Sequence, residues 1–348
     1  MRIPRIGDLP SGPRDSIADV DGVTVGHCTL DAGSVQTGVT VITPHAGNAF
    51  LEKVPAAACV MNGFGKTAGL VQLMELGVLE SPIALTNTFA VGAVLTALVR
   101  RSVATTPEIG RTLSTVNPVV AECNDGYLND LQAFAVGEPH VDQACESAAT
   151  TFARGAVGAG RGMSCFGLKG GIGSASRTAI IDASPFTIGV LVLANFGRLP
   201  QLMLAGRRIG SSLAHRLAQS VATAEQGSII VVVATDAPVD ARQLRRIAFR
   251  TSAGIARTGG TFGHGSGDIA IAFSTAERIA EQPVASIGFP HVLAEPLLDP
   301  LFEAVAYATE QAIVDALFSA MTVRGRDAHV RLALVDVAPD WLALEAGQ

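Results

Sequence analysis

The stretch Ser228-Ile-Ile-Val-Val-Val-Ala-Thr235 is an unbroken run of mainly β-branched apolar residues. Such a run is typical of a strand that is buried on both faces. It follows Gly227 and the polar pair Glu225-Gln226, which come after a segment with a helical pattern. The sequence therefore predicts a loop that enters a rigid, buried strand at Ser228.

Strand-like and helix-like segments extend over the whole chain of 348 residues. We predict further strands at Val23–Leu30, Gly38–Thr43, Phe186–Ala194, Asp268–Ser274 and Val330–Val335. We predict helices at Thr67–Leu76, Ala90–Val99, Val141–Ala153, Ser211–Ala224, Asp240–Ala256 and Leu293–Ala320. This mixture indicates an α/β or α+β fold, with sheet layers covered by helices.

The stretch Gly155–Ser176 contains eight glycines, and from this composition we expect loops, tight turns or close backbone approach rather than a regular element. The chain shows no internal repeat and no low-complexity linker. We therefore expect one domain over residues 1–348.

The composition excludes several classes of function. Hydrophobic residues make up 48% of the chain, which is enough for a large core, and the formal net charge of −6 argues against binding to nucleic acid. The five cysteines are scattered without metal-ligand spacing, so we expect reduced thiols and no metal. No apolar run reaches the length of a membrane span or signal peptide, which places the protein in the cytoplasm.

Familiar catalytic and nucleotide-binding motifs fail on inspection. Gly65-Lys66-Thr67 resembles the end of a phosphate-binding loop, but Val60 stands where that motif needs glycine. The glycine-rich stretch lacks the spacing of a dinucleotide site, and Gly162–Gly167 misses the nucleophile elbow by one residue. His264 is expected in a loop rather than as a base. No cofactor is implied.

A hydrolase without a histidine base or a metal can use the backbone amine of its own nucleophile. A free α-amine has a pKa of about 7.7–8.0, so near neutral pH part of it can accept a proton. The nucleophile must then become residue one by scission of the chain after a small residue. Five Gly-Ser dipeptides meet that condition, but only Gly227–Ser228 opens a strand-like run. On this pattern alone, an ordinary junction between loop and strand is the favoured explanation.

Several motifs lie along nearly the whole chain, at residues 5–15, 17–27, 122–130, 194–197, 227–238 and 265–268. Together they resemble the DmpA family of L-aminopeptidase/D-esterases, which includes the β-peptidyl aminopeptidases. The resemblance implies an αββα sandwich of the type shared with ornithine acetyltransferases. It also implies a precursor that cuts itself into residues 1–227 and 228–348, which stay together as a heterodimer. Four heterodimers typically assemble into a tetramer.

The resemblance assigns roles to residues of this chain. It places the nucleophile at Ser228, supporting groups at Ser266 and Asp268, and an oxyanion donor at Asn195. It places the carboxylate that receives the substrate's free amino group at Glu122. Where some members carry an oxyanion-binding tyrosine, this chain has Asn124, with Tyr127 three positions later. Asn124 and Tyr127 are therefore candidate substrate contacts.

The predicted function is a self-processing aminopeptidase, or amidase and esterase, acting on small substrates with a free amino terminus. One alternative is acyl transfer, as in the ornithine acetyltransferases, whose nucleophile is typically threonine. A second alternative is an unprocessed, non-catalytic binding protein of the same fold. Transfer of the acyl group to an amine rather than to water would distinguish acyl transfer from hydrolysis. An intact purified chain would favour the non-catalytic binding protein.

Overall fold

Strand β13 (Ser228–Thr235) lies inside the larger of two β-sheets in the computed structural model, which describes residues 3–217, 227–282 and 291–344. This sheet has the strand order β15-β3-β14-β13-β10-β9, and β4 pairs with β3. Strand β13 runs parallel to β14 and antiparallel to β10. All of its residues are buried. The other strands are β15 (Ile279–Ala280), β3 (Glu52–Gly63), β14 (Gly267–Ser274), β10 (Ser184–Asn195), β9 (Gly171–Ile181) and β4 (Val78–Leu79).

The second sheet has four strands in the order β1-β2-β5-β6. They are β1 (Thr24–Leu30), β2 (Thr37–Thr43), β5 (Ile83–Asn87) and β6 (Val119–Cys123). Strands β5 and β6 are parallel, and helix α2 (Val91–Thr105) lies between them in the sequence.

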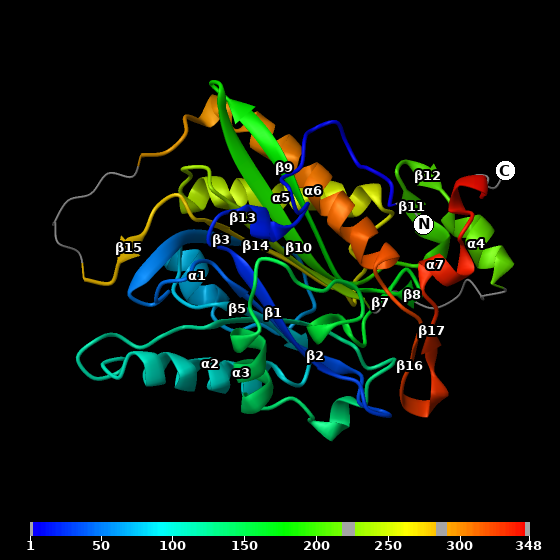
Figure 1. The fold of residues 1–348 in the computed structure, drawn as a ribbon, viewed down its shortest axis with the longest axis horizontal. Coiled ribbons are helices and arrows are strands. Elements are labelled where there is room, and N and C mark those ends of the chain that lie inside the picture. Colours follow the sequence, from blue (N-terminus) through cyan, green and yellow to red (C-terminus); the bar gives the residue numbers. More distant parts are fainter. Residues whose placement is uncertain (1–2, 218–226, 283–290, 345–348) are drawn as a thin grey trace.

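Helices cover the outer face of each sheet, so the layers follow the order helix, sheet, sheet, helix (Figure 1). Helices α5 (Ala241–Arg257) and α6 (Asp299–Phe318) pack on the larger sheet, whereas α2 and α3 (Glu138–Glu146) pack on the smaller one. Along β13, Ile229 and Val231 contact the helix side, while Ile230 and Val232 face the other sheet. Burial on both faces is the reason for the unbroken apolar run.

Shorter elements complete the chain. Helix α5 begins with a capping box in which Asp240 and Gln243 bind each other's backbone N–H groups. The short helices are α1 (Leu70–Leu76), α4 (Gly210–Arg216) and α7 (Leu334–Val337), with 3₁₀ turns at Ile17–Asp19, Leu131–Ala133, Gly158–Gly160, Leu199–Gln201, Glu295–Leu297, Arg326–Ala328 and Trp341–Ala343. The short strand pairs are β7 (Ser164–Cys165) with β8 (Leu168–Lys169), β11 (Met203–Leu204) with β12 (Arg207–Arg208), and β16 (Val323–Arg324) with β17 (Val330–Arg331).

The αββα architecture agrees with the expectation, and most predicted elements are present. The strand predicted at Val330–Val335 is wrong beyond Arg331, because the chain turns into α7 at Leu334. The helix predicted at Ser211–Ala224 corresponds to α4, and residues 218–226 lie outside the described residues. Among the described helices, none is long and apolar enough to span a bilayer.

The expectation of loops throughout Gly155–Ser176 is also wrong, since β9 begins at Gly171. The glycines in this strand have a packing reason. A Cβ atom on Gly173 would lie 1.9 Å from the carbonyl oxygen of Ala312 in α6. Glycine therefore allows the helix to approach the strand closely, which agrees with the expected close backbone approach although the segment is a regular strand.

Candidate active site

Three strands of the larger sheet meet at the edge where β13 begins. Ser228, the first residue of β13, lies opposite Asn195, the last residue of β10. On its other side it lies opposite Gly267, the first residue of β14. Strand direction thus brings together residues that are 33 to 72 positions apart in the sequence, and the predicted Ser266–Asp268 motif reaches the same edge.

Ser228 is almost completely buried, with 4% of its surface exposed. Because side chains alternate along a strand, it shares a face with Ile230 and Val232, which pack between the two sheets. Its Oγ accepts a hydrogen bond from the backbone N–H of Gly267, with an N–O distance of 3.3 Å. The hydroxyl therefore has a defined position inside the sandwich.

Gly227, directly before the candidate nucleophile, is held against the end of β10. A Cβ atom at this position would lie 2.5 Å from the carbonyl oxygen of Asn195 and 2.5 Å from the Cα of Phe196. Such distances are below van der Waals contact, so any larger residue would displace the backbone. The structure thus gives a steric reason for glycine at the predicted cleavage position.

Ser266 and Asp268 form a buried pair beside this edge. The hydroxyl of Ser266 donates to Asp268 Oδ1 at 2.6 Å, and both residues are at most 1% exposed. Asn62 of β3 lies opposite Asp268 and donates from Nδ2 to the carbonyl oxygens of Ser266 and Gly263. A register shift between β14 and β3 falls at Asp268, as is common for bulges beside functional sites.

Both ends of the Asn195 side-chain amide are fixed. Its Oδ1 accepts the backbone N–H of Ser164 at 2.7 Å, and its Nδ2 donates to the carbonyl oxygen of Asn124 at 3.0 Å. A backbone N–H can only donate and a carbonyl can only accept, so these partners assign the amide orientation. Nδ2 has two N–H groups, and the bond to Asn124 uses one of them.

Asn124 and Tyr127, the two candidate substrate contacts, bind different neighbours. The Asn124 side chain turns back and accepts the N–H of Gly126, so it reaches Asn195 only through its carbonyl. Tyr127 is 38% exposed, and its ring stacks on His329, with 4.5 Å between the ring centroids. The guanidinium of Arg331 lies over the same ring at 3.5 Å.

Glu122 lies at the end of β6 and is 2% exposed. Its Oε1 accepts the backbone N–H of Lys66 at 2.9 Å, and its Oε2 accepts the hydroxyl of Thr88. An ionised carboxylate has room for about four hydrogen bonds, so these two donors leave capacity for a substrate ammonium group. The Gly65-Lys66-Thr67 segment, rejected as a phosphate-binding loop, therefore serves to hold this carboxylate.

The loop at Gly65 connects Glu122 to the Ser228 edge. A Cβ on Gly65 would lie 3.5 Å from the Cα of Gly267 and 3.8 Å from Glu122 Oε1. Burial raises the pKa of the Cys123 thiol well above its usual value, and the carboxylates of Glu122 and Asp268 raise it further. The two carboxylates therefore act on the same buried region, and the candidate amine site lies close to the candidate nucleophile.

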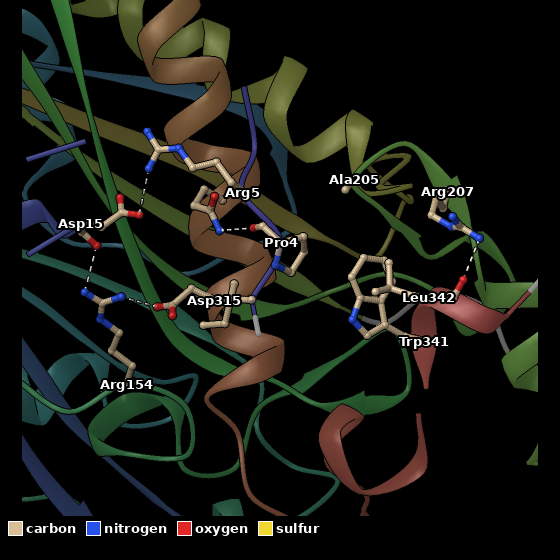
Figure 2. A pocket seen from close by; sticks show the side chains of 11 residues that line it. Pro4, Arg5, Asp15, Arg154, Ala205, Arg207, Asp315, Trp341 and Leu342 are labelled. Atoms are coloured by element: carbon tan, nitrogen blue, oxygen red, sulfur yellow. Dashed lines mark hydrogen bonds and ion pairs between the residues drawn. The ribbon is translucent and has the colours of Figure 1, made fainter. Parts of the chain in front are cut away.

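A metal site and a cavity near the chain ends are the two other kinds of site that the structure addresses. Among the described residues, no group of three His, Cys, Asp or Glu side chains could hold a metal ion. A cavity of about 690 Å³ lies near the chain ends, away from Ser228 (Figure 2). There Arg154 donates to Asp315 and to the Asp15 carbonyl, while Arg207 donates to the Leu342 carbonyl. These polar groups of the cavity already bind one another.

Sequence reasoning missed several groups that shape the site. They are the side chains of Asn62, Thr88 and Arg331 and the backbone N–H groups of Lys66 and Ser164. The Asn62-Gly63-Phe64-Gly65 segment carried a usable signal, because two glycines beside a polar residue suggest a tight turn. The backbone donors carried none, since any residue type supplies an N–H.

The fold and this site define an enzyme of the N-terminal nucleophile class with a serine nucleophile. The sequence matches the description "Peptidase family S58" over residues 15–331, so the chain belongs to this family. Its activity is that of a serine aminopeptidase, and the alternatives of acyl transfer and of a non-catalytic binding protein are not favoured.

Three known proteins illustrate the relationship. The beta-peptidyl aminopeptidase BapA of Sphingosinicella microcystinivorans is 38% identical over 336 residues, which cover 90% of this chain and 84% of that protein. The PH0078 protein of Pyrococcus horikoshii OT3 superposes with a TM-score of 0.90 at 47% identity, over 95% of this chain and 94% of that one. The L-aminopeptidase D-Ala-esterase/amidase of Ochrobactrum anthropi, described as a variant of the Ntn hydrolase fold, has a TM-score of 0.87 at 34% identity, over 98% of each chain.

Proposed function

We propose that this aminopeptidase matures by cutting its own Gly227–Ser228 bond, and that the mature enzyme uses Ser228 as nucleophile and its new α-amine as base. The observation that carries the proposal is the meeting of Ser228, Asn195 and Gly267 at one sheet edge, beside the buried Ser266–Asp268 pair. Tight packing at Gly227 supports the position of the scissile bond. Residues 1–227 and 228–348 would remain together, because β13 pairs with β10 of the first fragment.

In the proposed mechanism, the Ser228 hydroxyl attacks the substrate carbonyl while the α-amine of the same residue accepts its proton. A free α-amine has a pKa of about 7.7–8.0, which suits proton transfer near neutral pH. The amine then gives this proton to the leaving group, and water hydrolyses the acyl-enzyme. Ser266 and Asp268 would align the amine, since Gly267 between them lies opposite Ser228.

Asn195 would stabilise the negative oxygen that forms during attack. Its Nδ2 is held by the carbonyl of Asn124 and retains a second N–H for the oxyanion. Asn124 would thus contribute through its backbone carbonyl, while its side-chain Oδ1 accepts the N–H of Gly126. Tyr127, partly exposed on the same loop, is the further candidate for contact with substrate.

Glu122 would receive the free amino group of the substrate as an ion pair. Its buried carboxylate is held in place by Lys66 and Thr88 and lies next to the loop that contacts Gly267. The relatives are named as a beta-peptidyl aminopeptidase and as an L-aminopeptidase D-Ala-esterase/amidase. We propose small peptides, amides or esters with a free amino terminus for this chain. We further propose a single domain, assembly into a tetramer of heterodimers, and a location in the cytoplasm.

A denaturing gel with N-terminal sequencing tests the proposal. Purified protein should give fragments of 227 and 348 − 227 = 121 residues, and the smaller should begin Ser-Ile-Ile-Val. The matched control is Ser34→Ala, which changes an exposed Gly-Ser dipeptide and should leave the fragment pattern unaltered. A chain that stays intact and still hydrolyses substrate would refute the α-amine as base.

A further inference from the structure

Lys169 is a completely buried lysine in β8, with 0% of its surface exposed. Its Nζ donates to the carbonyl oxygens of Gly160 at 2.8 Å, Met163 at 2.9 Å and Gly170 at 2.8 Å. An ammonium group has three donors and no acceptor, so these carbonyls use its full capacity. Burial lowers the pKa of Lys169 well below its usual value, whereas the three carbonyl acceptors stabilise the protonated form. Burying this group is costly even when it is well bonded, so its presence calls for a reason beyond stability.

The Met163–Ser164 peptide bond connects Lys169 to the active site. Its carbonyl oxygen accepts from Lys169 Nζ and from the N–H of Gly170 at 3.0 Å. Its N–H, which belongs to Ser164, donates to Asn195 Oδ1 at 2.7 Å. The C=O and N–H of a peptide are conjugated, so a cation on the oxygen strengthens the N–H as a donor. The distance to Asn195 is at the short end of the range for N–H···O bonds.

The orientation of the Asn195 amide matters for its proposed role. Only its NH₂ group can donate to an oxyanion, and a flipped amide would place a carbonyl oxygen there instead. The Ser164 N–H binds Oδ1 and prevents this flip. Because Asn195 lies directly opposite Ser228, this orientation bears on the reacting atoms.

We propose that Lys169 is a positioning residue that acts through the Met163–Ser164 peptide to hold the Asn195 amide with Nδ2 available to the oxyanion. The proposal rests on the proposed function, since it requires Asn195 to be the oxyanion donor. It also explains part of the glycine-rich stretch. A Cβ on Gly170 would lie 2.4 Å from the carbonyl oxygen of Ala194, so glycine lets the Lys169 segment reach the end of β10.

The experiment is a double-mutant cycle with Lys169→Met and Asn195→Ala, measured by steady-state kinetics on fully processed enzyme. Asn195→Ala should lower kcat by about 10²–10³-fold, as loss of one oxyanion donor does in other hydrolases. Lys169→Met should lower kcat by about 10–100-fold and leave KM within about twofold, because substrate binding is untouched. In the double variant, kcat should equal that of Asn195→Ala alone, since both changes remove the same interaction.

The matched control is Lys53→Met. Lys53 is a lysine of the larger sheet that pairs with Glu80 and Glu281, away from the site, so its loss should leave kcat at the wild-type value. Lys169→Gln retains two N–H donors, and it replaces Lys169→Met in the experiment if the Lys169→Met protein does not fold or process. Its effect on kcat should likewise disappear when it is combined with Asn195→Ala.

Two results would overturn the role of Lys169 and leave the role of Asn195 intact. The first is a wild-type kcat in the Lys169 variants. The second is that a Lys169 variant lowers kcat by the same factor in the Asn195→Ala background as in the wild-type background. A wild-type kcat in Asn195→Ala itself would instead refute the oxyanion role in the proposed function, and this inference with it.

Discussion

Two Gly-Ser dipeptides lie in the same sheet and are buried to a similar degree. Ser174 follows Gly173 inside β9, and Ser228 follows Gly227 at the start of β13, with β10 between the two strands. The Ser174 hydroxyl donates to the carbonyl of Val190 at 2.7 Å and accepts the N–H of Ile17 at 2.8 Å. The Ser228 oxygen accepts only the longer 3.3 Å bond from Gly267, within the part of the chain that the structure describes.

This difference shows how position in a strand decides the use of a hydroxyl. Inside a strand, the serine satisfies backbone groups of neighbouring segments and is fixed by them on both sides. At the start of a strand, it meets the end of β10, the start of β14 and the loops that adjoin them. Its proton is then available for chemistry, so the same dipeptide is structural in one place and a candidate nucleophile in the other.

The largest effect is expected from removing the Ser228 hydroxyl. Ser228→Ala should remain one chain of 348 residues without activity, because it lacks the hydroxyl that we propose attacks both the Gly227 carbonyl and the substrate. Ser174→Ala should still be cut. A denaturing gel of both purified variants measures cleavage. Scission of Ser228→Ala at the same bond would show that Ser228 is no more necessary for cleavage than Ser174.

Blocking the substrate's amine should have the next largest effect. An acetylated substrate cannot pair with Glu122 and leaves a buried carboxylate without its partner, a loss of about 2–5 kcal/mol for a desolvated pair. Free-amine anilides should therefore have a much higher kcat/KM than their acetylated forms. Equal values for the two would mean that the Ser228 edge belongs to a general amidase rather than an aminopeptidase.

Ser266→Ala should have a smaller effect on turnover. General acid–base assistance is worth about 10²–10⁴-fold, and loss of alignment alone should remove only part of it, mainly in kcat. Asp268→Asn keeps an acceptor for the Ser266 hydroxyl but removes the charge, so it should also lower kcat and slow cleavage of the precursor. Steady-state kinetics on processed variants of wild-type melting temperature provide the measurement. Wild-type kcat in both variants would show that Gly265–Asp268 is a structural turn without a part in catalysis.

The smallest effect on catalysis is expected from Ser174→Ala, which should act on stability. The change leaves the buried Val190 carbonyl and Ile17 N–H without their partner, at a cost of about 1–3 kcal/mol for each group. Urea unfolding should show this loss, while kcat of the processed enzyme stays at the wild-type value. Ser34→Ala, at an exposed position, serves as the control with unchanged unfolding free energy. A fall in kcat of Ser174→Ala would contradict its purely structural role.

The sequence predicted the parts of the fold that depend on local pattern. Strand β13 has the bounds that its apolar run indicated, and α5 begins at Ala241, one residue after the predicted start at Asp240. Strand β3 was missed because its centre is rich in alanine, which does not favour strands. The extended part of the glycine-rich stretch was missed because Gly173 is required by its close contact with α6, which lies more than a hundred positions away in the sequence.

The sequence by itself determined that a serine after glycine would open a buried strand, and the family motifs selected the residues around it. Only the tertiary structure decided how those side chains are held. Asn195 takes its amide orientation from Ser164 and Asn124, and Glu122 is bound by Lys66 and Thr88. The reason is physical. Periodicity and composition report which faces are buried, whereas these bonds depend on strand register and on backbone groups that every residue type shares.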